Sequence, residues 1–379
     1  MWAWLLLVLA ASLAGAQDLA RGEIVDNVPC LAAGDQHYAL YLPSNYSPDR
    51  KWPVLLLFDA GGRGRRGVER YQSAAEKYGY IVAGSNNSRN GPWEVSARAA
   101  QAMAADVSTR FPLDRARVYT GGMSGGARVA MSLALASSDI AGVFASSAAW
   151  PNEPQASVPI PIFGSAGSDD FNHQEMRTLD LELKSPHRVL FFQGWHEWLP
   201  AEVATEGVEW MELQAMRTGK RPKDPALIDA LFAQHVARAE KETDPYRQFV
   251  LFTNLAADFK DFKDVSSYAN KAAELKSRKE VAWEPVYDPA KITDEMNAHI
   301  VRLGGGMSTQ LTDPKAGGGI YLFVANGELD MQGKSLPKWS MVYVEPEEDA
   351  AEIRAGAKGL ELLVMQFPKD DDLPAQAVA

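Results

Sequence analysis

The sequence has little cysteine and little excess basic charge. Cys30 is the only cysteine among 379 residues, so no internal disulfide and no cysteine-rich metal site can form. We expect Cys30 to behave as a small, partly buried apolar residue. Lys and Arg number 38 against 49 Asp and Glu, and the formal net charge is −11. This balance argues against nucleic acid and anionic membrane surfaces as partners.

An apolar run opens the chain at residues 1–16 and ends in Ala14-Gly15-Ala16, an A-x-A pattern that fits cleavage before Gln17. The run has no Lys or Arg and is too short to cross a bilayer comfortably. We expect a cleaved signal peptide, with an uncleaved anchor as the alternative. The mature protein would then be secreted or periplasmic, with no stable membrane span.

The length and the 46% hydrophobic content allow a full core and more than one domain. Changes in sequence character divide the chain into a signal peptide (1–16), an α/β domain (17–218), a helical segment (219–282), a β domain (283–370) and a tail (371–379).

Apolar runs alternate with helix-forming segments in the first domain, which predicts a mainly parallel sheet with helices on both faces. Two short β-type runs at 23–28 and 37–42 look like an antiparallel edge. The expected strands are 53–58, 80–84, 118–121, 142–147, 160–163 and 188–192. The expected helices are 68–78, 96–110, 174–183 and 202–216, and a further helix is expected directly after Ser124. Ligands of such sheets bind at the carboxyl ends of the strands.

Helical spacing predicts helices at 224–241, 245–259 and 265–279, and an aromatic stripe in the second is most simply a core face. Short β-type runs follow at 319–324, 327–331, 340–344 and 360–367. Their order resembles the last half of a cupin barrel. Cupin metal sites use clustered histidines, and this region has only His299, so we expect a structural or ligand-binding barrel without a metal.

The pentapeptide Gly122-Met123-Ser124-Gly125-Gly126 follows an apolar strand and precedes a small-residue helix. This G-x-S-x-G pattern is typical of a serine nucleophile held on a sharp turn, whose following N–H faces a developing oxyanion. Glycines flank the turn because side chains there would collide with the neighbouring strand and helix. The alternative is a tight structural turn without chemistry.

An activated serine needs a base and a residue that orients the base. The loop expected at 164–172 offers Asp169 and Asp170; we favour Asp170, because the loop needs length to carry a carboxylate across the sheet edge. Either could instead be a solvated loop residue.

Among six histidines, only His196 follows a strand of the expected sheet at its carboxyl end. His187 precedes its strand, and His173 is more easily a surface residue of a helix. His196 is therefore the expected base. The alternative is a structural histidine stacked between Trp195 and Trp198.

Residues 38–216 resemble the α/β-hydrolase fold family, in the small bacterial esterase branch that includes polyhydroxybutyrate-depolymerase-like and feruloyl-esterase-like proteins. The resemblance places the nucleophile on Ser124, the acid on Asp170 and the histidine on His196. It implies ester hydrolysis through an acyl-enzyme, without a cofactor.

The same resemblance implies that the backbone N–H groups of Gly125 and Gly61 form the oxyanion hole, with Ala60 as the neighbour of the second donor. Many family members carry His-Gly at the start of that second loop, whereas this chain has Asp59-Ala60. How the loop is held is therefore an open point at the level of sequence.

Five further side chains fall on loops at the same sheet edge and are candidates for substrate binding: Asn87, Asn90, Trp93, Trp150 and Trp195. The asparagines could equally be ordinary turn residues. No long insertion interrupts residues 141–192, so no helical lid is expected, and an open cleft suits a bulky or polymer-attached ester. A serine peptidase of the same fold and a non-catalytic binding or scaffold protein are the alternative functions.

Overall fold

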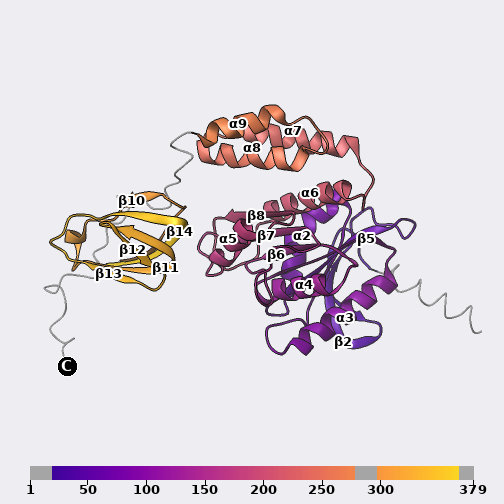
Figure 1. Ribbon diagram of the computed structural model, residues 1–379. Coiled ribbons are helices and arrows are strands. Elements are labelled where there is room, and N and C mark those ends of the chain that lie inside the picture. The colour runs from indigo at the N-terminus through magenta and orange to yellow at the C-terminus, as the bar shows by residue number, and fades with distance from the viewer. Residues whose placement is uncertain (1–18, 278–296, 367–379) are drawn as a thin grey trace, which may run out of the picture. The chain divides into compact units, whose positions relative to one another are not determined.

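Figure 1 shows the computed structural model, which describes residues 19–277 and 297–366. The chain divides into two compact units, Met1–Leu231 and Phe232–Ala379. The expected signal peptide (1–16), the tail (371–379) and the expected start of the β domain at residue 283 lie outside the described residues. Among the described helices, none combines the length and apolar character that crossing a bilayer requires.

The first unit is built on an eight-stranded sheet of order β1-β2-β4-β3-β5-β6-β7-β8. The pairs β1–β2 and β2–β4 are antiparallel and the others parallel, so the first two strands form the antiparallel edge expected from the sequence. The strands are β1 (Ile24–Cys30), β2 (Ala33–Tyr41), β3 (Trp52–Asp59), β4 (Ile81–Ser85), β5 (Leu113–Met123), β6 (Ile140–Ser146), β7 (Ile162–Gly167) and β8 (His187–Phe192).

Helices cover both faces of this sheet, as Figure 1 shows. Strand β3 is buried along its whole length, and its alternate residues enter two cores: Leu56 and Phe58 on one face, Leu55 and Leu57 on the other. The first core includes α3 (Trp93–Arg110), α4 (Gly125–Ala136) and α5 (His173–Glu182); the second includes α2 (Gly64–Tyr78) and α6 (Ala201–Arg217). This confirms the predicted mainly parallel sheet with helices on both faces.

Strand β7 is longer than the sequence suggested, and the loop that follows it is shorter. Residues 164–167 were expected in the loop, but they pair with β8 as far as Gly167 opposite Phe192. Small side chains allow this close approach: a Cβ at Gly164 would lie 2.7 Å from Met176 of α5. The loop therefore spans only residues 168–172, which fixes Asp169 and Asp170 next to the strand end.

Within residues 218–277, three helices follow the sheet: α7 (Pro225–Lys241), which crosses the boundary between the units, α8 (Pro245–Phe259) and α9 (Ser266–Lys276). Asp244 caps α8 by accepting the Arg247 N–H, with Pro245 as the first helical residue. The predicted aromatic stripe packs inward: the ring centroids of Phe259 and Phe232 lie 5.2 Å apart, and the ring of Phe252 stacks on that of Tyr268.

The second unit also contains an antiparallel sheet of six strands, β9 (Asn297–Leu303), β10 (Ser308–Gln310), β11 (Ile320–Met331), β12 (Lys334–Pro337), β13 (Met341–Val344) and β14 (Glu352–Gln366). Its buried residues, including Leu322, Leu362 and Val364, form a separate hydrophobic cluster.

Two strand predictions in this sheet were wrong. The runs 319–324 and 327–331 belong to the one strand β11, because Asn326-Gly327 forms an irregularity in its pairing with β14 rather than a turn. Gly327 has a φ of 74°, and a Cβ there would lie 2.0 Å from the Gly359 carbonyl oxygen, so glycine permits the close approach. The last strand, expected from residue 360, begins at Glu352.

Candidate active site

Ser124 lies on the sharp turn between β5 and α4. Its backbone has φ 57° and ψ −124°, a conformation that non-glycine residues rarely adopt. A Cβ at Gly126 would lie 2.0 Å from the Phe58 carbonyl oxygen, and one at Gly122 would lie 2.4 Å from Gly126 backbone atoms. The two glycines therefore let strand β3, strand β5 and helix α4 meet closely enough to hold the serine on this turn.

The loops after β7 and β8 bring two side chains to Ser124. His196 Nε2 lies 2.8 Å from Ser124 Oγ, and His196 Nδ1 lies 2.8 Å from Asp170 Oδ1. The Asp170 side chain is fully buried, while His196 remains 21% exposed. With the Nδ1 proton directed at a carboxylate, Nε2 is the nitrogen that can accept the serine proton.

The structure distinguishes the two acid candidates. Asp170 Oδ1 also accepts the N–H of Asn172 at 2.8 Å, which holds the carboxylate toward the histidine. Asp169 instead accepts bonds from Ser168 Oγ and Gln193 Nε2 in an exposed part of the loop. The histidine therefore contacts Asp170 and not Asp169.

Two other histidines that are close to His196 in sequence serve the scaffold. His173 is buried against Phe191, and its Nδ1 lies 3.0 Å from the Gly167 carbonyl oxygen. His187 contacts the carbonyl oxygens of Ser185 and Asp180. Neither has a contact with Ser124.

The two expected oxyanion donors differ in availability. Gly125 begins α4, and its N–H has no acceptor among the described residues. The Gly61 N–H donates to Asp59 Oδ1 at 2.7 Å, so this donor is occupied and does not match the expected role. The neighbouring Ala60 accepts the Asn90 N–H through its carbonyl oxygen at 2.8 Å.

Asp59 holds the loop after β3 in place. Its buried carboxylate accepts bonds from Arg63 Nε at 2.8 Å and from Trp198 Nε1 at 2.7 Å, besides the Gly61 N–H. Burial alone would raise the pKa of the Asp59 carboxyl, but the bonds from Arg63, Trp198 and Gly61 outweigh it and lower the pKa below its ordinary value. Trp198 lies two residues after His196, so Asp59 connects the loop after β3 to the histidine loop.

The five substrate-binding candidates have different environments. Asn87 fixes its loop to β2, because its side chain accepts the His37 N–H and donates to the Asp35 carbonyl oxygen. Trp150 is only 4% exposed and lines a small separate cavity of about 150 Å³. Asn90 is exposed beside Gly125, and Trp93 and Trp195 are 47% and 72% exposed.

Two features of the site were missed by sequence reasoning. Phe171 is 76% exposed, yet its ring stacks on the His196 imidazole with centroids 3.9 Å apart. Arg128 of α4 and Glu175 of α5 form a bidentate ion pair, with N–O distances of 3.0 and 2.6 Å. The only sequence signal for the stacking of Phe171 on His196 was that Phe171 follows Asp170. Nothing in the sequence indicated that Arg128 and Glu175 form an ion pair.

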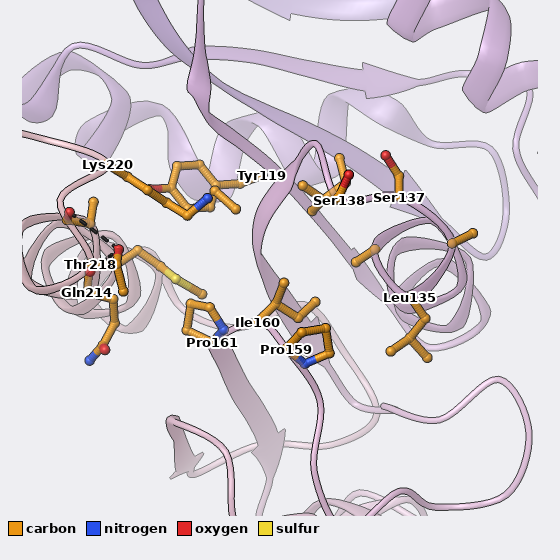
Figure 2. Close-up of a pocket in the computed structure, with 16 residues that line it drawn as sticks. Tyr119, Leu135, Ser137, Ser138, Pro159, Ile160, Pro161, Gln214, Thr218 and Lys220 are labelled. Atoms are coloured by element: carbon orange, nitrogen blue, oxygen red, sulfur yellow. Dashed lines mark hydrogen bonds between the residues drawn. The ribbon is translucent and has the colours of Figure 1, made fainter.

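A cavity of about 390 Å³ lies elsewhere in the first unit (Figure 2). Tyr119, Leu135, Ile160 and Pro161 give it an apolar lining, with Lys220 at one side. Its walls come from the end of α4, the start of β6 and the end of α6, and none of Ser124, His196 and Asp170 lines it. Among residues 19–277 and 297–366, no group of three or more His, Cys, Asp or Glu side chains could hold a metal ion.

The strand order, the serine turn between β5 and α4, and the histidine after β8 together define an α/β-hydrolase fold in the first unit. No protein-family model and no curated protein matches the sequence.

Solved structures similar to this chain include esterases. An esterase from Pyrobaculum calidifontis is 11% identical with a TM-score of 0.40, over 54% of this chain and 90% of its own. The feruloyl esterase module from Clostridium thermocellum, complexed with sinapinate, is 15% identical with a TM-score of 0.40, over 49% of this chain and 85% of its own. The fluorophosphonate-binding serine hydrolase FphF from Staphylococcus aureus is 16% identical with a TM-score of 0.39, over 51% of this chain and 99% of its own. At these values the similarity carries no information about substrate.

Proposed function

We propose that the protein is a serine hydrolase that cleaves carboxylic esters through an acyl-enzyme. The observation that supports it is the continuous contact from Ser124 Oγ to His196 Nε2 and from His196 Nδ1 to Asp170 Oδ1, each 2.8 Å long. Three loops far apart in sequence bring these groups together at the carboxyl ends of strands, where a substrate can reach them.

In the proposed reaction, Ser124 Oγ attacks the ester carbonyl carbon as His196 Nε2 takes its proton. The carbonyl electron pair moves to the oxygen, which becomes the tetrahedral oxyanion facing the Gly125 N–H. The C–O bond to the alcohol then breaks, and His196 returns the proton to the leaving oxygen. Water, deprotonated by His196, then attacks the acyl carbon; the bond from that carbon to Ser124 Oγ breaks, and His196 returns the proton to Ser124 Oγ as the acid leaves.

The surroundings of His196 favour a bulky or polymer-attached ester as the substrate. Phe171, which is mostly exposed, stacks on the histidine that protonates the leaving alcohol, and the neighbouring residue in sequence, Trp195, is also mostly exposed. Exposed aromatic rings offer an apolar contact surface to an ester whose alcohol is large. A serine peptidase would use the same trio, so hydrolysis of matched ester and amide substrates separates the two activities.

A fluorophosphonate probe tests the proposal without knowledge of the natural ester. We expect the wild type to be labelled, Ser124→Ala not to be labelled, and His196→Ala to lose about 10⁴-fold or more in labelling rate and ester turnover. Ser108→Ala, which changes an exposed serine of α3, is the matched control and should label normally. A wild type that resists labelling would instead support the binding or scaffold function.

We also propose export from the cytoplasm, based on residues 1–16, and a structural or ligand-binding role for the cupin-like C-terminal sheet. Mass spectrometry of the protein from its native host tests export, with Gln17 expected as the first residue of the mature chain.

A further inference from the structure

Acyl transfer normally uses at least two oxyanion donors, and of the Gly125 and Gly61 N–H groups expected here only one is unoccupied. The Gly125 N–H has no acceptor among the described residues. The Gly61 N–H is held by the Asp59 carboxylate at 2.7 Å. Because the pKa of Asp59 is lowered, this acceptor is charged at neutral pH, and a charge-assisted bond of this kind is among the stronger ones in proteins. A side chain beside Gly125 can supply a further donor.

Asn90 lies beside the residue that supplies the first donor. The loop after β4 runs along the loop after β3, with Arg89 bridged to Gly61 and the Asn90 N–H bonded to the Ala60 carbonyl oxygen at 2.8 Å. This backbone contact directs the Asn90 side chain over Gly125. A Cβ built on Gly125 would lie 1.8 Å from Asn90 Oδ1, 2.9 Å from Cγ and 3.4 Å from Nδ2.

The Asn90 amide has no hydrogen bond to any other described residue, although it is packed against the start of α4. Asn87, three residues earlier, uses both ends of its amide to hold the loop. Rotation of the Asn90 amide about its last torsion exchanges Oδ1 and Nδ2, and this torsion has two broad wells of similar energy. The amide can therefore present an N–H beside Gly125 when an anionic oxygen forms there.

We propose that Asn90 is a catalytic residue whose Nδ2 donates a hydrogen bond to the tetrahedral oxyanion, next to the Gly125 N–H and in place of the Gly61 N–H. This rests on the proposed ester hydrolysis. As the Ser124 Oγ bond to the carbonyl carbon forms and the π pair moves to the oxygen, Asn90 keeps its proton and stabilises the new charge. The bond strengthens only as charge develops, so its loss lowers kcat rather than raising KM.

The test compares wild type, Asn90→Ala, Asn90→Asp and Asn90→Gln with an activated aryl acetate such as p-nitrophenyl acetate. We expect Asn90→Ala to lower kcat by about 100-fold or more, as loss of a single side-chain donor does elsewhere, with KM changed by less than about threefold. Asn90→Asp should be at least as slow, because it removes the donor and adds a negative charge. Asn90→Gln should recover part of the loss. Asn152→Ala, in the exposed loop after β6, is the control and should match wild type.

Two further measurements separate the possible failures. The thermal midpoint of Asn90→Ala should equal that of wild type, since the side chain is exposed and makes no hydrogen bond, and its fluorophosphonate labelling should slow in parallel with kcat. An active wild type with Asn90→Ala within about threefold of its kcat would overturn the role of Asn90 and leave the proposed function intact. A wild type that is neither labelled nor active on esters would overturn both.

Discussion

Asp59 ends strand β3, and its buried carboxylate accepts hydrogen bonds from three donors on two loops. A buried acceptor with several charge-assisted bonds stabilises the fold only while it remains ionised. The stabilisation that the ionised Asp59 carboxylate provides can therefore be measured by substituting the residue or by changing the pH.

Asp59→Asn keeps the shape and one acceptor oxygen but removes the charge. We expect it to lower the free energy of unfolding by about 1–3 kcal/mol at pH 7, since hydrogen bonds to charged groups are worth about this much. The measurement is urea unfolding followed by tryptophan fluorescence. Ser108→Ala, which leaves the Asp59 hydrogen bonds unchanged, should have the same free energy of unfolding as the wild type.

The pH dependence of this difference follows from the direction of the pKa shift. The folded-state pKa of Asp59 is lowered, so its contribution is complete above the unfolded-state pKa and is lost as the pH falls through that value toward the folded-state pKa. The difference in stability between the wild type and Asp59→Asn should therefore begin to shrink below about pH 4 and disappear below the folded-state pKa. A difference that is constant from pH 7 downward would contradict this assignment.

The positions of Ser124, His196 and Asp170 could be deduced from sequence because parallel strands present their carboxyl ends at one edge. Each of these residues follows a strand in the sequence, and this alone predicted that the three lie close together. The occupied Gly61 donor, the Phe171 stacking and the Asp59 bonds could not be deduced. They depend on side-chain directions and on contacts such as Asp59 with Trp198, 139 residues apart, which no local pattern records.

At the scale of elements, helices α4 and α5 are joined by Arg128 and Glu175. Glu175 Oε1 also accepts the N–H groups of Ala149 and Trp150, and Arg128 Nη1 donates to the Trp150 carbonyl oxygen. The pair thus connects the helix after the serine, the loop after β6 and the helix after the acid loop.

Glu175→Ala would leave Arg128 without its carboxylate partner and two backbone N–H groups without their acceptor. We expect it to lower the free energy of unfolding by about 1–3 kcal/mol, measured by urea unfolding. Glu182→Ala, at the exposed end of the same helix, is the matched control and should stay within about 0.5 kcal/mol of wild type. Equal stability of the two variants would mean that the pair contributes nothing.

Element predictions succeeded where apolar runs were long or regularly spaced and failed where glycine allowed a strand to continue. Gly164 and Gly167 belong to β7, although both were assigned to the loop after it, and β11 continues through Gly327, which was taken as the start of a separate strand. Glycine has no side chain to reveal burial, so its role depends on which neighbour approaches it, and that is set by tertiary packing.

At the scale of the whole molecule, the two units have their own hydrophobic cores. Leu57 is buried between β3 and the helices of the first unit, and Leu322 is fully buried in the C-terminal sheet of the second. Chains with separate cores commonly unfold in more than one step.

We expect calorimetry to show at least two transitions that respond to different substitutions. Leu322→Ala should destabilise the C-terminal sheet by about 2–5 kcal/mol and lower only its transition. Leu57→Ala should lower the other transition, together with the temperature at which fluorophosphonate labelling is lost. A single transition that both variants shift equally would show that the units unfold as one.

The backbone at Ser124 also bears on how such a chain would change over generations. Glycine adopts φ 57° with ψ −124° at little steric cost, whereas serine is strained there by about 1–3 kcal/mol. Selection can keep the serine only while its hydroxyl is useful. In a descendant that no longer needed the reaction, drift toward stability would favour glycine, and three consecutive glycines in place of Ser124-Gly125-Gly126 would mark a lineage in which the chemistry had been abandoned.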